Sequence, residues 1–361
     1  MSHALATAGL FALAGAVFLL PLIPAIVELR LKRDAQALNV IQQYAGDIRH
    51  FSFGFRSYAA ELLTPLQQCV DSGRTATGML PHGDRFLLLG RPEPALLLPG
   101  GSSEKVCDLV VAAGTDLTLP DGMTFMKEMY ASRELIGGAN CTYRAILGDG
   151  NVRLDCASAV TRWVHAAGTF QAEQDCDLYG RISSDREIML RDGCFFQRLH
   201  APRIVFGRTD TAAEAQGRGP SDHFGGPGAT SVAASRRLVD GDLEIGRGEV
   251  VTGSIVSRGQ LHIGAGARIL GSVKSNRRMT LESGVSIAGS VVSASAMQIG
   301  FNCRIAGPVI AEQGIAIGSG TRCGTPERPT TVSAPTIEVE DGAVVFGTIW
   351  ARQEGRVVPR Q

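Results

Sequence analysis

LEIGRGEVVTGSIVSRGQ (243–260), LHIGAGARILGSVKSNRR (261–278), MTLESGVSIAGSVVSASA (279–296) and MQIGFNCRIAGPVIAEQG (297–314) are four consecutive segments of 18 residues that decide the fold. Every segment opens with two apolar residues two positions apart. Further apolar residues follow at offsets 8 and 12. A fixed period of this length indicates a solenoid of stacked coils.

Each coil divides into three faces of six residues, because side chains alternate along a strand and each face supplies two inward positions. Glycines such as Gly246 and Gly253 fall between the faces, and we expect corners there with the positive φ that glycine tolerates. Stacking of the coils at about 4.8 Å then gives an all-β, three-faced parallel β-helix. The inward columns are Leu243, Leu261, Met279, Met297 and Ile315; Ile245, Ile263, Leu281, Ile299 and Ile317; Val251, Ile269, Ile287 and Ile305; Ile255, Val273, Val291 and Val309; and the small Ser257, Ser275, Ser293 and Ala311.

The same spacing continues on both sides. A last coil contains Ile337, Val339, Val345 and Ile349, and five less regular coils begin at Leu117. A stretch rich in Gly, Ala, Ser and Pro separates them, and we interpret it as a loop that projects from one continuous solenoid, in preference to a linker between two. The predicted organisation is upstream coils at 106–207, a flexible loop at 208–236, a β-helix at 237–351 and a tail at 352–361.

Composition favours this fold and argues against several functions. The chain has 44 glycines and only 6% aromatic residues, which suits frequent turns and small inward side chains. Basic and acidic residues number 35 each, so no net charge attracts nucleic acid. The eight cysteines form no CxxC pair and have no histidine at zinc-ligand spacing, which predicts reduced thiols, no metal and no cofactor. No GxxxxGK[ST] motif occurs, so we expect no nucleotide.

The N-terminal region predicts a single membrane anchor. Residues 4–27 contain no charged residue, and a helix over 4–29 is long enough for a hydrocarbon core of about 30 Å. Arg30, Lys32 and Arg33 follow this helix directly. By the positive-inside rule they place the body in the cytoplasm, beneath the bacterial inner membrane. A cleaved signal peptide is the competing interpretation.

A second helix is expected at 34–66, where apolar and aromatic residues repeat in an a/d pattern. The helix associates with another copy or a partner, or it lies on the bilayer or on its own body; the sequence leaves these alternatives open. The Pro- and Gly-rich residues 71–105 are interpreted as a linker that also covers the first coil. The candidate self-association residues are Ile41, Tyr44, Ile48, Phe51, Phe55, Tyr58 and Leu62.

The run Gly241-Asp-Leu-Glu-Ile-Gly246, with Gly253-Ser-Ile-Val256, Gly271-Ser-Val273 and Gly289-Ser-Val-Val292, resembles the bactofilins, a family of bacterial polymer-forming cytoskeletal proteins. The resemblance implies a right-handed β-helix, nucleotide-independent end-to-end polymerisation, membrane association, and scaffolding of cell-envelope or polysaccharide machinery. The anchor, the heptad helix and the upstream coils depart from the family pattern. A short membrane-tethered oligomer is therefore an equal expectation to a filament.

The main enzymatic alternative is a hexapeptide acyltransferase or a β-helical carbonic anhydrase. Such sequences place a large aliphatic residue every six positions, whereas offset 6 here holds Glu249, Ala267 and Thr321. His165, His200 and His262 lie on well-separated coils, so we expect no catalytic or zinc site and no enzyme.

The ends of a solenoid expose unpaired backbone groups, and ends of matching shape add to one another. The C-terminal coil is followed by only about ten residues and is predicted to be uncapped. The partners expected are therefore a second copy, the inner membrane and an envelope or polysaccharide assembly protein. A monomeric membrane-tethered binding module is the alternative. The candidate end-contact residues are Ile337, Val345, Phe346, Ile349 and Trp350.

Overall fold

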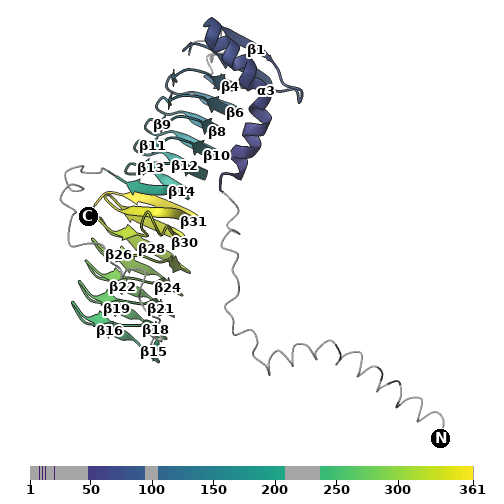
Figure 1. Ribbon diagram of the computed structural model, residues 1–361. Helices are drawn as coiled ribbons and strands as arrows, with labels where there is room; N and C mark the ends of the chain where they lie inside the picture. The colour runs from purple at the N-terminus through teal and green to yellow at the C-terminus, as the bar shows by residue number, and fades with distance from the viewer. Residues whose placement is uncertain are drawn as a thin grey trace. The chain divides into compact units, whose positions relative to one another are not determined.

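The computed structural model describes residues 48–93, 105–207 and 236–360, together with the single positions 8, 10, 13 and 20. Contacts divide the chain into two units, Met1–Asp47 and Ile48–Gln361. The second unit is a β-solenoid of about twelve turns with mostly parallel strands, as the sequence predicts (Figure 1).

The downstream run contains the strict repeat, and its columns pair in register as predicted. Leu261 pairs with Met279, and Met279 pairs with Met297 on the next coil. The strands of this run are β15 (Arg236–Val239), β16 (Leu243–Ile245), β17 (Val250–Val251), β18 (Ser254–Ser257), β19 (Leu261–Ile263), β20 (Arg268–Ile269), β21 (Val273–Ser275), β22 (Met279–Leu281), β23 (Ser286–Ile287), β24 (Val291–Ser293), β25 (Met297–Ile299), β26 (Arg304–Ile305), β27 (Val309–Ala311), β28 (Gly314–Ile317), β29 (Arg322–Cys323) and β30 (Thr330–Glu340).

The corner glycines have two different physical roles. The positive φ angles expected at Gly246 and Gly264 lie instead two residues later, for example at Gly266, with φ 71°. Glycine is needed at Gly271 for a different reason, because a Cβ there would lie 2.3 Å from the carbonyl oxygen of Gly253 on the neighbouring coil. Close stacking of the coils therefore selects these glycines as strongly as backbone conformation does.

The column of small inward residues satisfies the corner carbonyls. The hydroxyl of Ser275 is completely buried and donates to the carbonyl oxygen of Gly259 at 2.8 Å. Ser257 and Ser293 make the equivalent bonds to the coils before them. A carbonyl buried at a corner without such a donor would cost about 1–3 kcal/mol, which explains a hydroxyl in an otherwise apolar column.

The upstream run is also parallel, and its inward residues Leu117, Phe125 and Met129 are buried as predicted. From β6 to β14 every second strand is long, and each of these long strands ends in at least three consecutive buried residues. The strands are β3 (Val106–Cys107), β4 (Val110–Ala113), β5 (Leu117–Thr118), β6 (Thr124–Ala131), β7 (Leu135–Ile136), β8 (Thr142–Gly148), β9 (Val152–Leu154), β10 (Ala159–Ala166), β11 (Phe170–Ala172), β12 (Asp177–Ser184), β13 (Glu187–Leu190) and β14 (Phe195–Phe206).

The two runs meet at their C-terminal coils with the chain direction reversed. The last strand, β31 (Val344–Val358), lies parallel to β30 and antiparallel to β14. β15 lies at the far end of the downstream run (Figure 1). The segment after β14 therefore joins a strand at the junction to a strand at the far end. The prediction of one continuous solenoid with a projecting loop is wrong, because periodicity carries no information on chain direction. Most of the predicted tail is also strand, since β31 extends to Val358.

One helix and one hairpin precede the coils. Within the described residues, the helix α3 (His50–Ser72) overlaps the predicted helix at 34–66 and ends later than predicted. Part of the predicted linker forms β1 (Thr75–Met79) and β2 (Arg85–Leu89), which pair as an antiparallel hairpin. β2 then pairs in parallel with β4, so residues 85–89 cover the first coil, as the sequence indicated.

The predicted membrane helix at 4–29, its flanking residues Arg30, Lys32 and Arg33, and the helix residues Ile41 and Tyr44 lie outside the described residues, apart from four single positions. Within the part of the chain that the structure describes, no helix is both long enough and apolar enough to cross a membrane.

Candidate functional site

The candidate end-contact residues lie inside the body, at the junction of the two runs. Val345 pairs with Ile204 of β14, and Ile349 pairs with Leu199. The prediction that the C-terminal coil is uncapped is therefore wrong, because β14 supplies both strand partners and apolar contacts. Ile337, Val345 and Ile349 are buried, Phe346 is partly buried, and Trp350 is 45% exposed.

Packing at the junction is tight. Gly355 of β31 lies opposite Phe196 of β14, and a Cβ on Gly355 would lie 2.2 Å from the Phe196 ring. Phe196 is fully buried and packs on Phe206, with ring centroids 5.7 Å apart. The ring thus occupies the space that any side chain at position 355 would need.

The unpaired end of the downstream run is its first coil, 236–251. Among the described residues, each of its strands β15, β16 and β17 has a strand partner on one side only. The N–H of Leu243 donates to Gln260, and the carbonyl of Ile245 accepts from Gly264, each at 2.9 Å. Because the direction of these groups alternates along a strand, the N–H and C=O of Glu244 point to the open edge. We call residues 236–251 the open coil.

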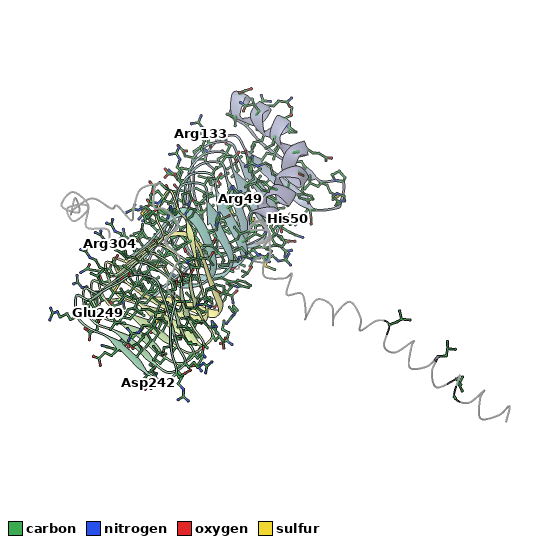
Figure 2. The ribbon with its side chains drawn as sticks, turned by 60° about the horizontal axis from the view of Figure 1, so that its bottom comes forward. Arg49, His50, Arg133, Asp242, Glu249 and Arg304 are labelled. Atoms are coloured by element: carbon green, nitrogen blue, oxygen red, sulfur yellow. The ribbon has the colours of Figure 1, made fainter. Side chains whose placement is uncertain are left out.

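The open coil exposes apolar side chains and carries charge in the core columns. Leu238 and Val250 are 55% and 60% exposed. Arg237 is in register with the inward Ile255 of the next coil. Val250 is in register with Arg268, so Glu249 has the position in the open coil that Ala267 has in the next one. Both charged side chains, Arg237 and Glu249, are exposed, and the Glu249 carboxylate accepts from the Gly246 N–H at 2.8 Å. Charged residues at a sheet edge discourage indiscriminate stacking. Figure 2 shows Glu249 at this end, far from Arg133.

The helix α3 packs along the side of the upstream run. Of the candidate self-association residues within it, Phe55 and Leu62 are buried against outward-facing residues of β2, β4 and β10, and Ile48 just before it is buried too. Phe51 is 44% exposed, and Tyr58 is partly buried. Among the described residues, one column of the heptad pattern thus covers the chain's own body, one of the alternatives that the sequence left open.

Three acidic residues hold the polar side of α3: Asp149 and Asp185, which lie two coils apart, and Asp84 of the β1–β2 hairpin. Arg56 makes two hydrogen bonds to Asp149, which also accepts from Tyr130 at 2.7 Å. Burial opposes ionisation of Asp149, but the bonds from Arg56 and Tyr130 outweigh it and lower the pKa of this carboxyl. A second contact of this kind pairs Arg49 with Asp185 at 3.3 Å.

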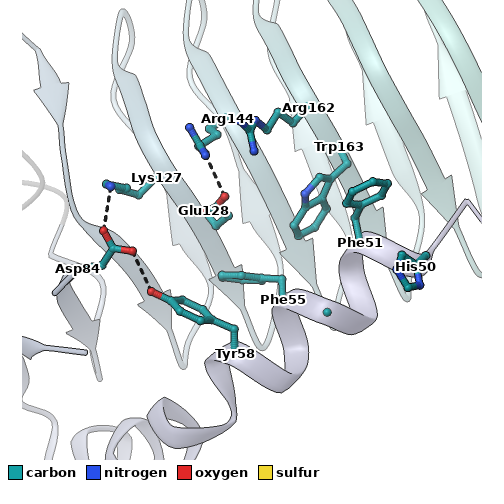
Figure 3. A pocket seen from close by; sticks show the side chains of 11 residues that line it. His50, Phe51, Phe55, Tyr58, Asp84, Lys127, Glu128, Arg144, Arg162 and Trp163 are labelled. Carbon is teal, nitrogen blue, oxygen red and sulfur yellow. Dashed lines mark hydrogen bonds and ion pairs between the residues drawn. The ribbon is translucent and has the colours of Figure 1, made fainter. Parts of the chain in front are cut away.

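The third acidic residue borders an open groove of about 440 Å³ between α3 and the strands (Figure 3). Asp84 accepts from Lys127 at 2.8 Å and from Tyr58 at 3.0 Å, and these bonds lower its pKa. Burial, followed by the bond to Asp84, raises the pKa of Tyr58 to about 12, so the phenol stays protonated. Figure 3 shows that this network and the Arg144–Glu128 pair line the groove with compensated charges.

A serine, a histidine and an aspartate meet beneath the start of α3. The Nδ1 of His165 lies 3.0 Å from the Ser183 hydroxyl, and its Nε2 lies 3.7 Å from Asp185. Sequence analysis missed this cluster, although His165 and Ser183 are one coil apart. His165 and Ser183 are both buried, so a substrate has no path to the hydroxyl. Burial lowers the pKa of His165, Asp185 opposes this effect, and Arg49 and Arg56 add to it. Burial therefore favours the neutral imidazole, and Asp185 links this cluster to Arg49.

The cysteines are unpaired thiols, and all except Cys156 are buried. Cys176 and Cys194 stack on neighbouring coils, and their thiols donate to the carbonyls of Asp155 and Glu173 at 3.3 and 3.1 Å. Within 48–93, 105–207 and 236–360, no three His, Cys, Asp or Glu side chains are grouped so that they could hold a metal ion.

No family model, curated protein or solved structure matches this chain. Its function is therefore inferred from its own geometry.

Proposed function

We propose that the protein is a non-catalytic scaffold that pairs with a second copy through the open coil. The observation that carries this proposal is the unpaired edge of β15, β16 and β17. An unpaired strand edge over apolar side chains is a template for another strand. Glu244 contributes a free N–H and C=O at the middle of that edge.

The internal junction supports an antiparallel mode of pairing. There β14 and β31 join two coil ends of this same fold with the strands antiparallel. Two open coils related by a two-fold axis would meet in the same sense, through one self-complementary surface. Such a contact closes on itself, so the expected product is a dimer. A filament would need a second contact, for which the outer edge of β1 is the available strand.

The cellular setting is proposed from the sequence. We place the N-terminal apolar segment in the bacterial inner membrane and the β-helical body in the cytoplasm, where the pair would organise cell-envelope or exopolysaccharide machinery, as the bactofilin resemblance implies. A membrane tether strengthens such a role, because it raises the effective concentration of open coils beside one another.

The test is a proline in the open edge. Glu244→Pro removes the N–H that points away from the body and leaves the bonds of Leu243 and Ile245 to the next coil intact. We expect the full-length wild type to sediment as a dimer in mild detergent, Glu244→Pro as a monomer with an unchanged far-ultraviolet circular dichroism spectrum, and the control Glu244→Thr as a dimer. A wild-type monomer, or a dimer that tolerates the proline, would overturn the proposal.

A second candidate function is a monomeric binding module for a partner protein. The observation that favours it is a pair of arginines without an acidic partner beside the start of α3. This surface is distinct from the open coil.

A further inference from the structure

Two arginines on neighbouring coils lie side by side without a counter-ion. Arg181 of β12 is in register with Arg198 of β14. Within the described residues neither side chain forms an ion pair or a polar hydrogen bond, and the Nε of Arg198 is buried without a partner. Like charges directly opposite each other in a sheet destabilise it. An unsatisfied buried donor adds a cost of about 1–3 kcal/mol.

Each guanidinium is stacked on an aromatic ring. Arg181 lies over Phe51 of α3 at 4.4 Å from the ring centroid, and Arg198 lies over Trp350 of β31 at 5.2 Å. Stacking holds the guanidinium planes in place and leaves their N–H edges available. Those edges match a carboxylate, which accepts two parallel hydrogen bonds from one guanidinium.

An apolar stripe leads away from this pair along the same face. Trp350 is in register with Ser333 on the neighbouring strand, and the following strands place Ile310 and then Val292 in the same row. Trp350 and Ile310 are 45% and 40% exposed, and Val292 is partly buried. The stripe thus presents an apolar surface next to two unpaired cations.

The same face of the upstream run is already covered by a helix. Trp163, the register partner of Arg181 on the other side, is buried against Phe55 of α3. Beyond the start of α3 this face carries no helix among the described residues. The distance from Arg181 to Val292 is five strand spacings, about 24 Å, which equals about 16 residues of α-helix.

We propose that Arg181 and Arg198 anchor an acidic amphipathic helix of a partner protein, whose apolar side lies along Trp350, Ile310 and Val292. Continuity with the α3 seam and charge complementarity specify this occupant. Lys274, further along the stripe, adds to the preference for an acidic helix. An acidic sugar chain fits less well, because the guanidinium groups cover the ring faces on which a sugar would stack. The proposal is independent of pairing through the open coil.

The probe is a 17-residue helical peptide with Leu on one side and Glu on its flank, compared with the same peptide carrying Gln for every Glu. Titration of the full-length protein is followed by calorimetry and by tryptophan fluorescence, to which Trp350 and Trp163 contribute. We expect the Glu peptide to bind at least tenfold more tightly than the Gln peptide. Arg198→Gln should lower the affinity for the Glu peptide at least tenfold. The control Arg277→Gln replaces an exposed arginine on a corner and should change this affinity less than twofold.

A melting midpoint equal to wild type would show that Arg198→Gln is folded. Ile310→Ser serves as a second variant and should weaken binding of both peptides equally, because Ile310 is exposed on the stripe and the change removes apolar contact and no charge. Equal affinities for the two peptides, or no binding at about 1 mM peptide, would overturn the proposal. Binding of an oligoglucuronate that depends on Arg198, in place of the peptide, would overturn the assignment to a protein partner.

Discussion

Gly355→Ala tests the junction of the two runs most sharply. The new Cβ would lie 2.2, 2.5 and 2.6 Å from three ring carbons of Phe196. The ring would have to move by about 1 Å within a fully buried site. Overpacking of this kind costs about 1–3 kcal/mol, and we expect about 2 kcal/mol. Thermal unfolding should show a midpoint about 3 °C below wild type, because the entropy of unfolding of a unit of this size is about 0.6–0.7 kcal/mol/K.

A double-mutant cycle assigns that loss to the contact between the runs. Phe196→Leu alone should cost about 1 kcal/mol, because it removes ring contacts. In the double variant the smaller side chain makes room for the Cβ, so the two losses should not add, with a coupling of about 1–2 kcal/mol. The control Gly241→Ala, whose Cβ meets nothing within 4 Å, should change stability by less than about 0.5 kcal/mol.

Two results would refute the reasoning. Losses at Gly355 and Phe196 that add within about 0.5 kcal/mol would mean that β31 does not lie on β14. A coupling that disappears on dilution would instead assign the contact to two copies.

Two further predictions concern buried polar groups. Ser275→Ala should lower the free energy of unfolding by about 1–2 kcal/mol in chemical denaturation, because the Gly259 carbonyl loses its donor. The control Ser283→Ala, at an exposed position, should leave the free energy of unfolding unchanged. Equal effects of the two substitutions would contradict the role of the hydroxyl column. His165 has its pKa lowered in the folded state, so its contribution to stability is complete above about pH 6.5 and is lost as the pH falls from there toward the folded-state pKa. His165→Gln should therefore reduce the dependence of the melting midpoint on pH below pH 6.5. An unchanged dependence on pH would show that this histidine does not cause it.

Much of the fold could be predicted, because a β-helix repeats its inward positions at one period. The columns that begin at Leu243 and Ile245 are set by local alternation and by the neighbouring coil, and both are visible in the sequence. The junction left no such signal, since β14 and β31 are brought together by chain reversal. One clue was available: alternation continues past Trp350 to the buried Ala351, Gly355 and Val357, which favours a longer strand over a tail.

The contacts of α3, the arginine pair and the open coil were harder to predict from the sequence than the fold. The heptad pattern located the buried Phe55 and Leu62 but could not say which surface they contact, because any apolar face satisfies it. Arg181 and Arg198 are 17 residues apart, and the strand register shifts just before Arg181, so a search at period 18 separates them. The sequence points to the C-terminal coil as the free end, because nothing in the period shows that β31 pairs with β14 and leaves the open coil unpaired.

Electron cryomicroscopy of the full-length protein tests the central claim directly. The account predicts a two-fold particle in which the open coils of two β-helical bodies meet at the centre and both α3 helices lie toward the outer ends. Single bodies, or bodies joined through the β1 edge with the open coil exposed, would contradict it.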